Sequence, residues 1–396
     1  MVRSALACIG LLVIASALGG CAALRSLAGR NTQSLEHAEV LGMSVDLRKT
    51  EKTICPREAI QMAVFAEAVL SGERAPKQLE TWHGGPDANR NGKLEFDEFA
   101  FHSEQGKFDE LGYFHPNPDV LASVSEPFAL TTAFRRRPDK FTFQTTYKPD
   151  YRCINRVGGD GDGGVAGIAG VLGASGESGS GGSSTSAGSS GRDGQPGGNG
   201  SSGGDGAGGP RLTVYATLVK TAFYDRLIAV SVEGSARDFV LLHPDATLTV
   251  VARGGDGGPG GSGGRGGDGG QGGSGNPPGS GGRGAQGGVG GSGGRGGPGG
   301  TVELIVDERF AELLERVRVD VDGGRAGLPG EAGQGGRAGR GGSGLGGAAS
   351  AADGSEGAAG QAGSPGSEGP RGSTTRRAGD VGARFAGVAG ITVLDP

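Results

Sequence analysis

The sequence predicts a mainly β protein in which an N-terminal β-sandwich-like domain precedes a β platform that carries three folded-back glycine-rich tracts. Three observations predict this class. Nearly all aromatic residues lie before residue 152 or in short strand-like segments, Gly recurs at every third position of the tracts 158–209, 254–300 and 323–372, and strand-like segments flank each tract. Both ends of each tract are therefore expected at a common sheet.

The N-terminus has the pattern of an exported protein. Residues 1–20 read as a signal peptide, with Arg3, an apolar run over 5–18 and small residues before Cys21. Leu18-Gly19-Gly20-Cys21 resembles a bacterial lipobox, which implies that Cys21 is lipidated and becomes N-terminal; the alternative is an ordinary signal peptide with an incidental cysteine. Because Ala22 is not the aspartate that the resemblance associates with inner-membrane retention, an outer-membrane anchor facing the periplasm or the cell surface is implied. Residues 21–39 are expected to form a lipidated tether.

Two further cysteines predict a disulfide. Removal of Cys8 with the signal peptide and lipidation of Cys21 leave Cys55 and Cys153. In an oxidising compartment the pair would close a loop of about 100 residues and stabilise the fold by about 4 kcal/mol. Two buried free thiols are the alternative. The pair brackets a predicted domain over 40–156.

Within that domain, 128–134 and 140–147 alternate apolar with polar residues and are rich in Phe and Thr, so both are predicted as strands. Residues 59–70 remain ambiguous. Ile60, Met62 and Val64 alternate as in a strand, but Met62, Phe65 and Val69 also share one face of a helix. A β-sandwich is weakly favoured, because the predicted disulfide would then tie two strands of one small domain.

Further strands separate the glycine tracts. They are predicted over 211–219, 227–233, 239–242, 247–252, 301–307, 317–321 and 391–394, with a helix over 308–316.

The glycine register is strict. The every-third position is Gly at 17 of 18 sites from Gly158 to Gly209 and at 15 of 16 from Gly254 to Gly299, with Thr185 and Pro278 as exceptions. The third tract loses the register only over 345–351. Because each break lies near the middle of its tract, each tract is predicted to run out, turn and come back.

A period of three suits polyproline II geometry, in which a glycine face can pack closely against other chains. The second tract has two bare faces per triplet and should lie inside a bundle, the third has one and should lie outside, and the first is mixed. The pattern resembles the polyglycine II bundles of glycine-rich antifreeze proteins and phage tail-fibre tips, and the whole chain resembles bacterial glycine-rich or collagen-like lipoproteins. Disorder and a collagen-type trimer are the alternatives, although proline is scarce for collagen.

Residues 87–98 resemble an EF-hand calcium loop. The resemblance implies side-chain ligands from Asp87, Asn89 and Asn91, the carbonyl of Lys93, a water-mediated contact from Glu95 and a bidentate Glu98, with Gly92 at the turn. The sequence His83-Gly84-Gly85-Pro86 does not favour an incoming helix, and only 96–105 would continue as an exiting helix. With a single loop, weak structural binding of Ca²⁺ is expected.

Composition limits the function. A net charge of −5 gives no basic footprint for nucleic acid, and the five histidines form no pair with ligand spacing. We expect a non-enzymatic, lipid-anchored cell-envelope protein with a structural or adhesive role, stabilised by calcium. Its expected partners are the membrane, through the N-terminal lipid, and an envelope or extracellular polymer or protein. Alternatives are an ice-binding or other ligand-binding surface protein, a calcium-responsive binding module, and an exported enzyme with a site in 40–156.

Overall fold

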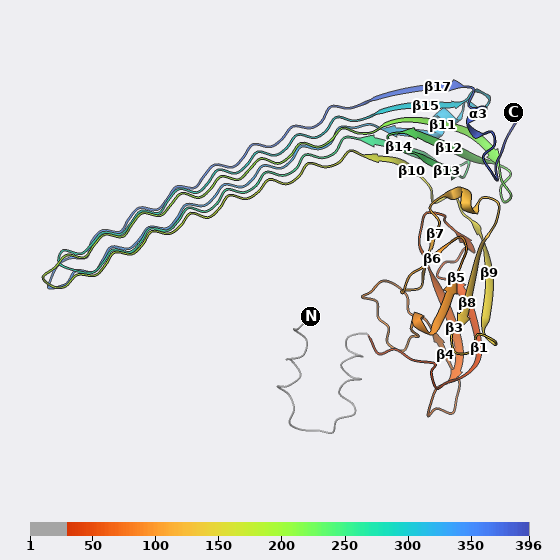
Figure 1. Ribbon diagram of the computed structural model, residues 1–396, viewed down its shortest axis with the longest axis horizontal. Coiled ribbons are helices and arrows are strands. Elements are labelled where there is room, and N and C mark those ends of the chain that lie inside the picture. The colour runs from red at the N-terminus through yellow and green to blue at the C-terminus, as the bar shows by residue number, and fades with distance from the viewer. Residues whose placement is uncertain (1–29, 396) are drawn as a thin grey trace. The chain divides into compact units, whose positions relative to one another are not determined.

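The computed structural model describes residues 30–395, which form two compact units (Figure 1). Unit 1 runs to Ile154 and includes 220–225 and 389–391, and unit 2 holds the rest. The predicted signal peptide, Cys21 and most of the predicted tether lie outside the described residues. The fold of both units is mainly β, as predicted.

Unit 1 is a β-sandwich. One sheet has the order β1-β3-β7-β6 with β4 paired to β3, and the other has the order β2-β9-β8-β5. The strands are β1 Glu39–Leu47, β2 Thr53–Ile54, β3 Ile60–Val69, β4 Lys77–Glu80, β5 Phe99–His102, β6 Gly106–Phe108, β7 Tyr113–Pro116, β8 Phe128–Phe134 and β9 Thr142–Pro149, and the 3-10 turns are η1 Phe96–Glu98 and η2 Val120–Ser123.

The ambiguous segment 59–70 is the strand β3. It pairs antiparallel with β1, β4 and β7, and it directs Met62, Val64 and Ala66 into the space between the two sheets. There they pack with Phe99 and Phe128 from the other sheet. The strand alternative wins because neighbours on both edges satisfy the backbone of the segment.

The end of the predicted tether belongs to unit 1. Leu35 is 1% exposed and packs in a core cluster with Val64 and Phe99. The expectation of a free tether up to residue 39 therefore needs correction, because an apolar side chain in this polar segment buries itself against the sandwich.

Unit 2 contains two sheets, where a single platform sheet was expected. Three strands form a parallel sheet in the order β10-β14-β16, and six form a sheet in the order β13-β12-β11-β15-β17 with β18 paired to β11. The bounds are β10 Arg156–Asp160, β11 Arg211–Lys220, β12 Leu227–Gly234, β13 Asp238–Leu242, β14 Leu248–Arg253, β15 Thr301–Asp307, β16 Val317–Asp320, β17 Ser373–Gly379 and β18 Thr392–Val393. The predicted helix over 308–316 is two short turns, η3 Glu308–Phe310 and α2 Leu313–Arg316, and α3 Gly382–Phe385 follows β17.

The sheets separate the strands by the direction of the glycine tracts. Strands β10, β14 and β16 lead into the tracts and pair in parallel, whereas β11, β15 and β17 receive the returning chain and pair in parallel with one another. Two sheets form because strands that lead into the tracts pair with one another, and strands that follow the tracts pair with one another. The tracts extend these two layers as six long arms (Figure 1).

We number the arms in chain order. Arms 1 to 6 are residues 161–182, 188–209, 254–275, 279–300, 324–344 and 351–372, and turns near Thr185, Pro278 and 345–350 connect them in pairs. The predicted out-and-back path of each tract is confirmed.

Candidate functional site

Backbone hydrogen bonds join the arms into a polyglycine II bundle. Consecutive arms are antiparallel: Gly258 on arm 3 donates its N–H to the carbonyl of Gly204 on arm 2, and Gly294 on arm 4 donates to Gly258, both at 2.8 Å. Arms two apart in the numbering are parallel to each other: Gly164 on arm 1 donates its N–H to the carbonyl of Asp256 on arm 3 at 2.8 Å. Odd arms therefore form one layer and even arms the other.

The second tract occupies the middle of this bundle, as its two bare faces predicted. Arms 3 and 4 each bond to four other arms, arms 2 and 5 to three, and arms 1 and 6 to two. The third tract places arm 6 at an edge, and the first tract, which the sequence left as mixed, places arm 1 at the other edge in the same way. Each of these tracts places one arm at an edge.

Glycine at the register positions is required by close backbone packing. A Cβ atom at Gly263 would overlap the carbonyl oxygen of Gly288, and one at Gly164 would overlap that of Gly204. At Gly163, which lies outside the register, the same atom would meet only the Asp256 carbonyl oxygen at 3.6 Å. The register thus marks interarm faces. In the second tract the second bare face packs as closely, since a Cβ atom at Gly264 would overlap the carbonyl oxygen of Val171.

Aspartates on the arms bond to neighbouring arms. Four of them each accept the backbone N–H of an arginine on the next arm of the same layer, at 2.6 to 2.7 Å. The pairs are Asp193 with Arg283, Asp205 with Arg295, Asp256 with Arg325 and Asp268 with Arg337. The N–H of Arg337 lowers the pKa of Asp268 below its ordinary value, with a further contribution from Arg265. The sequence analysis did not predict this bonding role of the aspartates.

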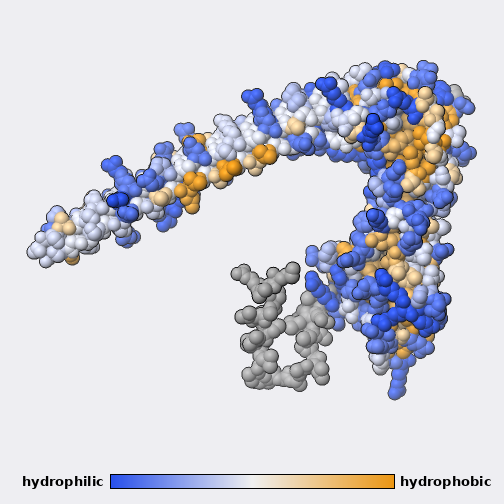
Figure 2. Space-filling model, in the orientation of Figure 1, coloured by the Kyte–Doolittle hydropathy of each residue, from blue (hydrophilic) through white to orange (hydrophobic). Residues whose placement is uncertain are grey.

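The two edge arms expose different side chains. Arm 1 carries Val165, Ile168, Val171 and Leu172, which are 76 to 78% exposed. The non-register positions of arm 6 carry only Ser, Ala, Glu, Gln, Pro, Asp and Arg. Figure 2 shows hydrophobic side chains interrupting the pale and polar surface along the bundle. The sequence analysis did not single out these aliphatic side chains.

The predicted calcium loop is held by residues 31–35. The N–H of Asn31 donates to Asn91 Oδ1 at 2.9 Å, that of Gln33 donates to the Lys93 carbonyl at 2.8 Å, and that of Leu35 donates to both Glu98 carboxylate oxygens at 3.0 Å. We call residues 31–35 the strap. Its alternate N–H groups take three of the six predicted ligand positions.

The other predicted ligands are spread around the loop. Asn89 Oδ1 accepts the N–H of Asn91 at 3.0 Å, Glu95 Oε2 accepts from Trp82 Nε1 at 3.1 Å and lies 3.5 Å from Arg90, and Asp87 is exposed. Leu94 is fully buried, and its backbone forms isolated parallel β-bridges with Gln33 and with Thr81. The exiting helix over 96–105 is absent from this region: the turn η1 is followed directly by β5, because Phe99 and Phe101 pair with β8.

Calcium does not fit the loop in this arrangement. A bidentate Glu98 would bind the ion along the line that the Leu35 N–H now occupies between the two oxygens. Burial also raises the pKa of Glu98 above its ordinary value, although Ser34 and Leu35 donate hydrogen bonds to it. Calcium binding stays a prediction, and it requires the strap to leave the loop.

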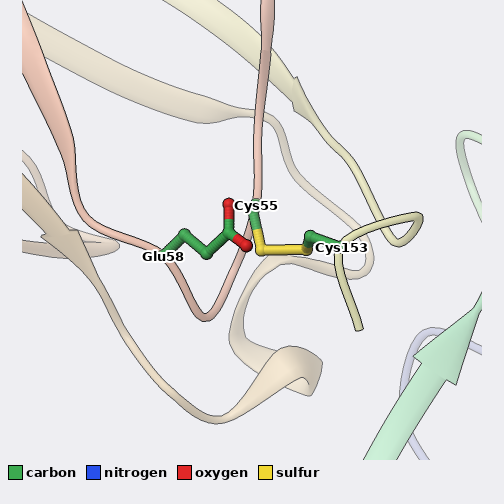
Figure 3. A group of neighbouring side chains, drawn as sticks. All are labelled: Cys55, Glu58 and Cys153. Carbon is green, nitrogen blue, oxygen red and sulfur yellow. A yellow bond between two sulfur atoms is a disulfide. The ribbon is translucent and has the colours of Figure 1, made fainter. Parts of the chain in front are cut away.

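The predicted disulfide between Cys55 and Cys153 is confirmed (Figure 3). The carboxylate of Glu58 lies beside the two sulfur atoms, and within residues 30–395 these three side chains form the one close group of potential metal-ligating Cys, His, Asp and Glu residues. The sulfur atoms are bonded to each other, so the group is a structural cross-link.

Comparison with protein-family models, curated proteins and solved structures finds no match to this chain. The function is therefore inferred from the geometry. Among the described residues, none of the helices is long and apolar enough to cross a bilayer.

Proposed function

We propose that this protein is a non-enzymatic, lipid-anchored component of the bacterial outer membrane, with a structural or adhesive role. The observation that carries the proposal is the six-arm bundle, in which glycines bond arm to arm and the positions that are not glycine display side chains. Such a body projects a stiff surface about 65 Å long, given a rise of about 3.1 Å per residue.

The bundle suits contact better than catalysis. Its side chains stand in straight rows, because residues three apart share one face of a polyproline II helix. Rows favour extended partners, such as an envelope or extracellular polymer or a protein surface. The anchor would be the lipid on Cys21.

Lipid labelling and deletion of the bundle test the two parts of this proposal. We expect metabolically labelled fatty acid on the wild-type chain in the outer-membrane fraction, and loss of label and release of the protein for Cys21→Ala. A chain in which short turns replace all three tracts should remain anchored and lose binding to envelope material. Wild-type protein without lipid, or unchanged binding without the bundle, would contradict the corresponding part.

Ice binding is the second candidate, because the arms form two hydrogen-bonded layers of extended chain. Charged residues such as Arg265 and Asp268 lie on those layers, and they do not suit an ice-binding face. Thermal hysteresis of the purified chain decides between the two, and we expect none. A calcium-responsive module would require calcium to change partner affinity, which the same binding assay with and without Ca²⁺ measures.

A further inference from the structure

We propose that the aliphatic row Val165, Ile168 and Val171 on arm 1 joins two copies of this chain in an antiparallel contact. The inference rests on the proposed structural or adhesive role and names the partner of the bundle. Each side chain of the row is 76 to 78% exposed, and so is Leu172 beside it. Because the residues are three apart, they lie in one straight row along the arm, about 9 Å from one to the next.

The construction of the bundle does not require these side chains. Arms 1 and 6 occupy equivalent edge positions, with two neighbouring arms each. At the corresponding positions arm 6 carries residues such as Ala358, Gln361 and Ser364, which are exposed. Exposed Val, Ile and Leu on arm 1 leave apolar surface in water, a condition that association with a partner relieves.

The row is self-complementary. Its sequence is symmetric about Ile168, so a two-fold axis at this residue places Val165 of each copy opposite Val171 of the other. An isologous contact of this kind needs only one surface patch. The same axis sets Asp162 opposite Ala174, which brings no charges together. A parallel alignment in register would instead oppose Asp162 to Asp162 and Glu177 to Glu177.

The apolar area predicts a weak dimer. The surface consists of four large aliphatic side chains with small neighbours: Val165, Ala166, Ile168, Ala169, Val171, Leu172 and Ala174. This set is too small for a standard interface of about 1,600 Å². Association is therefore expected in the upper micromolar range, and because the row carries no charge, salt should not weaken it.

Sedimentation velocity of the full mature chain tests this inference. Cys21→Ser removes the predicted lipid attachment, so the result does not depend on membrane anchoring. We expect a monomer–dimer equilibrium over micromolar to near-millimolar concentrations, weakened at least about tenfold by Ile168→Asp. Gln361→Asp introduces the same charge on arm 6 and should leave the equilibrium unchanged. A monomer at every concentration, or a dimer that Ile168→Asp does not weaken, would overturn the inference.

Cross-linking tests the alignment without relying on a destabilising variant. In the same background Ile168→Cys should form an intermolecular disulfide under mild oxidation, whereas Glu177→Cys should not. Equal cross-linking of both variants would exclude the antiparallel register. If monomeric wild-type protein bound uncharged phosphatidylcholine vesicles through the row, the row would be assigned to a lipid surface. That result would overturn self-association. Neither result bears on lipidation of Cys21, which the labelling experiment tests separately.

Discussion

The backbone N–H of Arg337 donates to the carboxylate of Asp268, 69 residues earlier in the chain, at 2.7 Å. Asp268 lies on arm 3 and Arg337 on arm 5, so this bond fixes how the two parallel arms align along their length. Three further aspartates make the same contact. A polyglycine II bundle has little apolar interior, and such bonds align its arms.

Asp268→Ala is expected to increase hydrogen exchange at Arg337 and to lower the melting temperature of unit 2. Asp268→Asn keeps a side-chain oxygen that accepts the same N–H, so it should have a smaller effect on the exchange at Arg337 and on the melting temperature. Exchange monitored residue by residue compares the two variants. Equal exchange at Arg337 in Asp268→Ala and wild type would show that the carboxylate does not hold the arm.

Glycine is expected to be replaceable at some tract positions and not at others. Gly264→Ala places a methyl group against the Val171 carbonyl and should destabilise the bundle by about 3 kcal/mol or more. Gly163→Ala is the matched control and should cost less than about 1 kcal/mol, because its methyl group has room. Thermal unfolding measures both, and similar losses would disprove the assignment of packing faces.

The strap is expected to compete with calcium. Gln33→Pro removes an N–H that bonds to Lys93, so it should weaken the strap and raise any affinity for Ca²⁺ by about tenfold. Thr32→Pro changes the alternate position, outside the 31, 33, 35 series of donors, and is the control. Calorimetric titration of both variants and wild type provides the measurement. Tight binding by wild type, unaffected by Gln33→Pro, would mean that the strap does not obstruct the site.

A buried carboxylate is expected to make unit 2 sensitive to acid. Asp307 is 1% exposed and accepts hydrogen bonds from Thr217 at 2.6 Å and Arg309 at 2.7 Å. Burial alone would raise its pKa, but the bonds from Arg309 and Thr217 hold the pKa below the ordinary value.

Because the folded-state pKa of Asp307 is lowered, its contribution to stability is complete above the unfolded value of about 3.9 and is lost as the pH falls through the folded value. Asp307→Asn should cost about 1 to 3 kcal/mol at neutral pH and flatten the loss of stability below about pH 4. Denaturant unfolding at several pH values checks this. An unchanged acid limb would show that other groups control it.

Reduction of the disulfide is expected to destabilise unit 1 selectively. Cys55 and Cys153 are 98 residues apart, and the chain-entropy estimate for a loop of that length is about 4 to 5 kcal/mol. The double variant Cys55→Ala with Cys153→Ala should lower the melting temperature of unit 1, while exchange protection in the glycine tracts stays at the wild-type level. Loss of protection in the tracts would indicate that the two units unfold together.

The sequence predicts the bundle well because its backbone geometry requires glycine at fixed positions. The turns near Thr185 and Pro278 and the central place of the second tract follow from that register. Strand β17 could not be predicted in the same way: Ser373–Gly379 lacks apolar alternation, and its pairing with β15 is imposed by the returning sixth arm.

A signal for the aspartate contacts was present in the sequence. Asp193 and Asp205 are 12 residues apart, as are Arg283 and Arg295, and tracts two and three repeat this spacing. Only the arrangement of the arms shows that these residues face each other. The calcium loop gives the opposite case, since its motif matches position by position, yet residues 31–35 contact its ligands. A local motif does not reveal a competitor from another part of the chain.

The continuity of the two sheets with the two layers of arms has a mechanical consequence. A pull on the distal turns acts along the arms, at right angles to the hydrogen bonds between them. Those bonds are then loaded in shear and share the force, so they do not open one after another from the tip. The bundle should therefore resist a force along the arms far better than a force that peels arm 1 or arm 6 away sideways. Single-molecule pulling in these two directions would measure the difference.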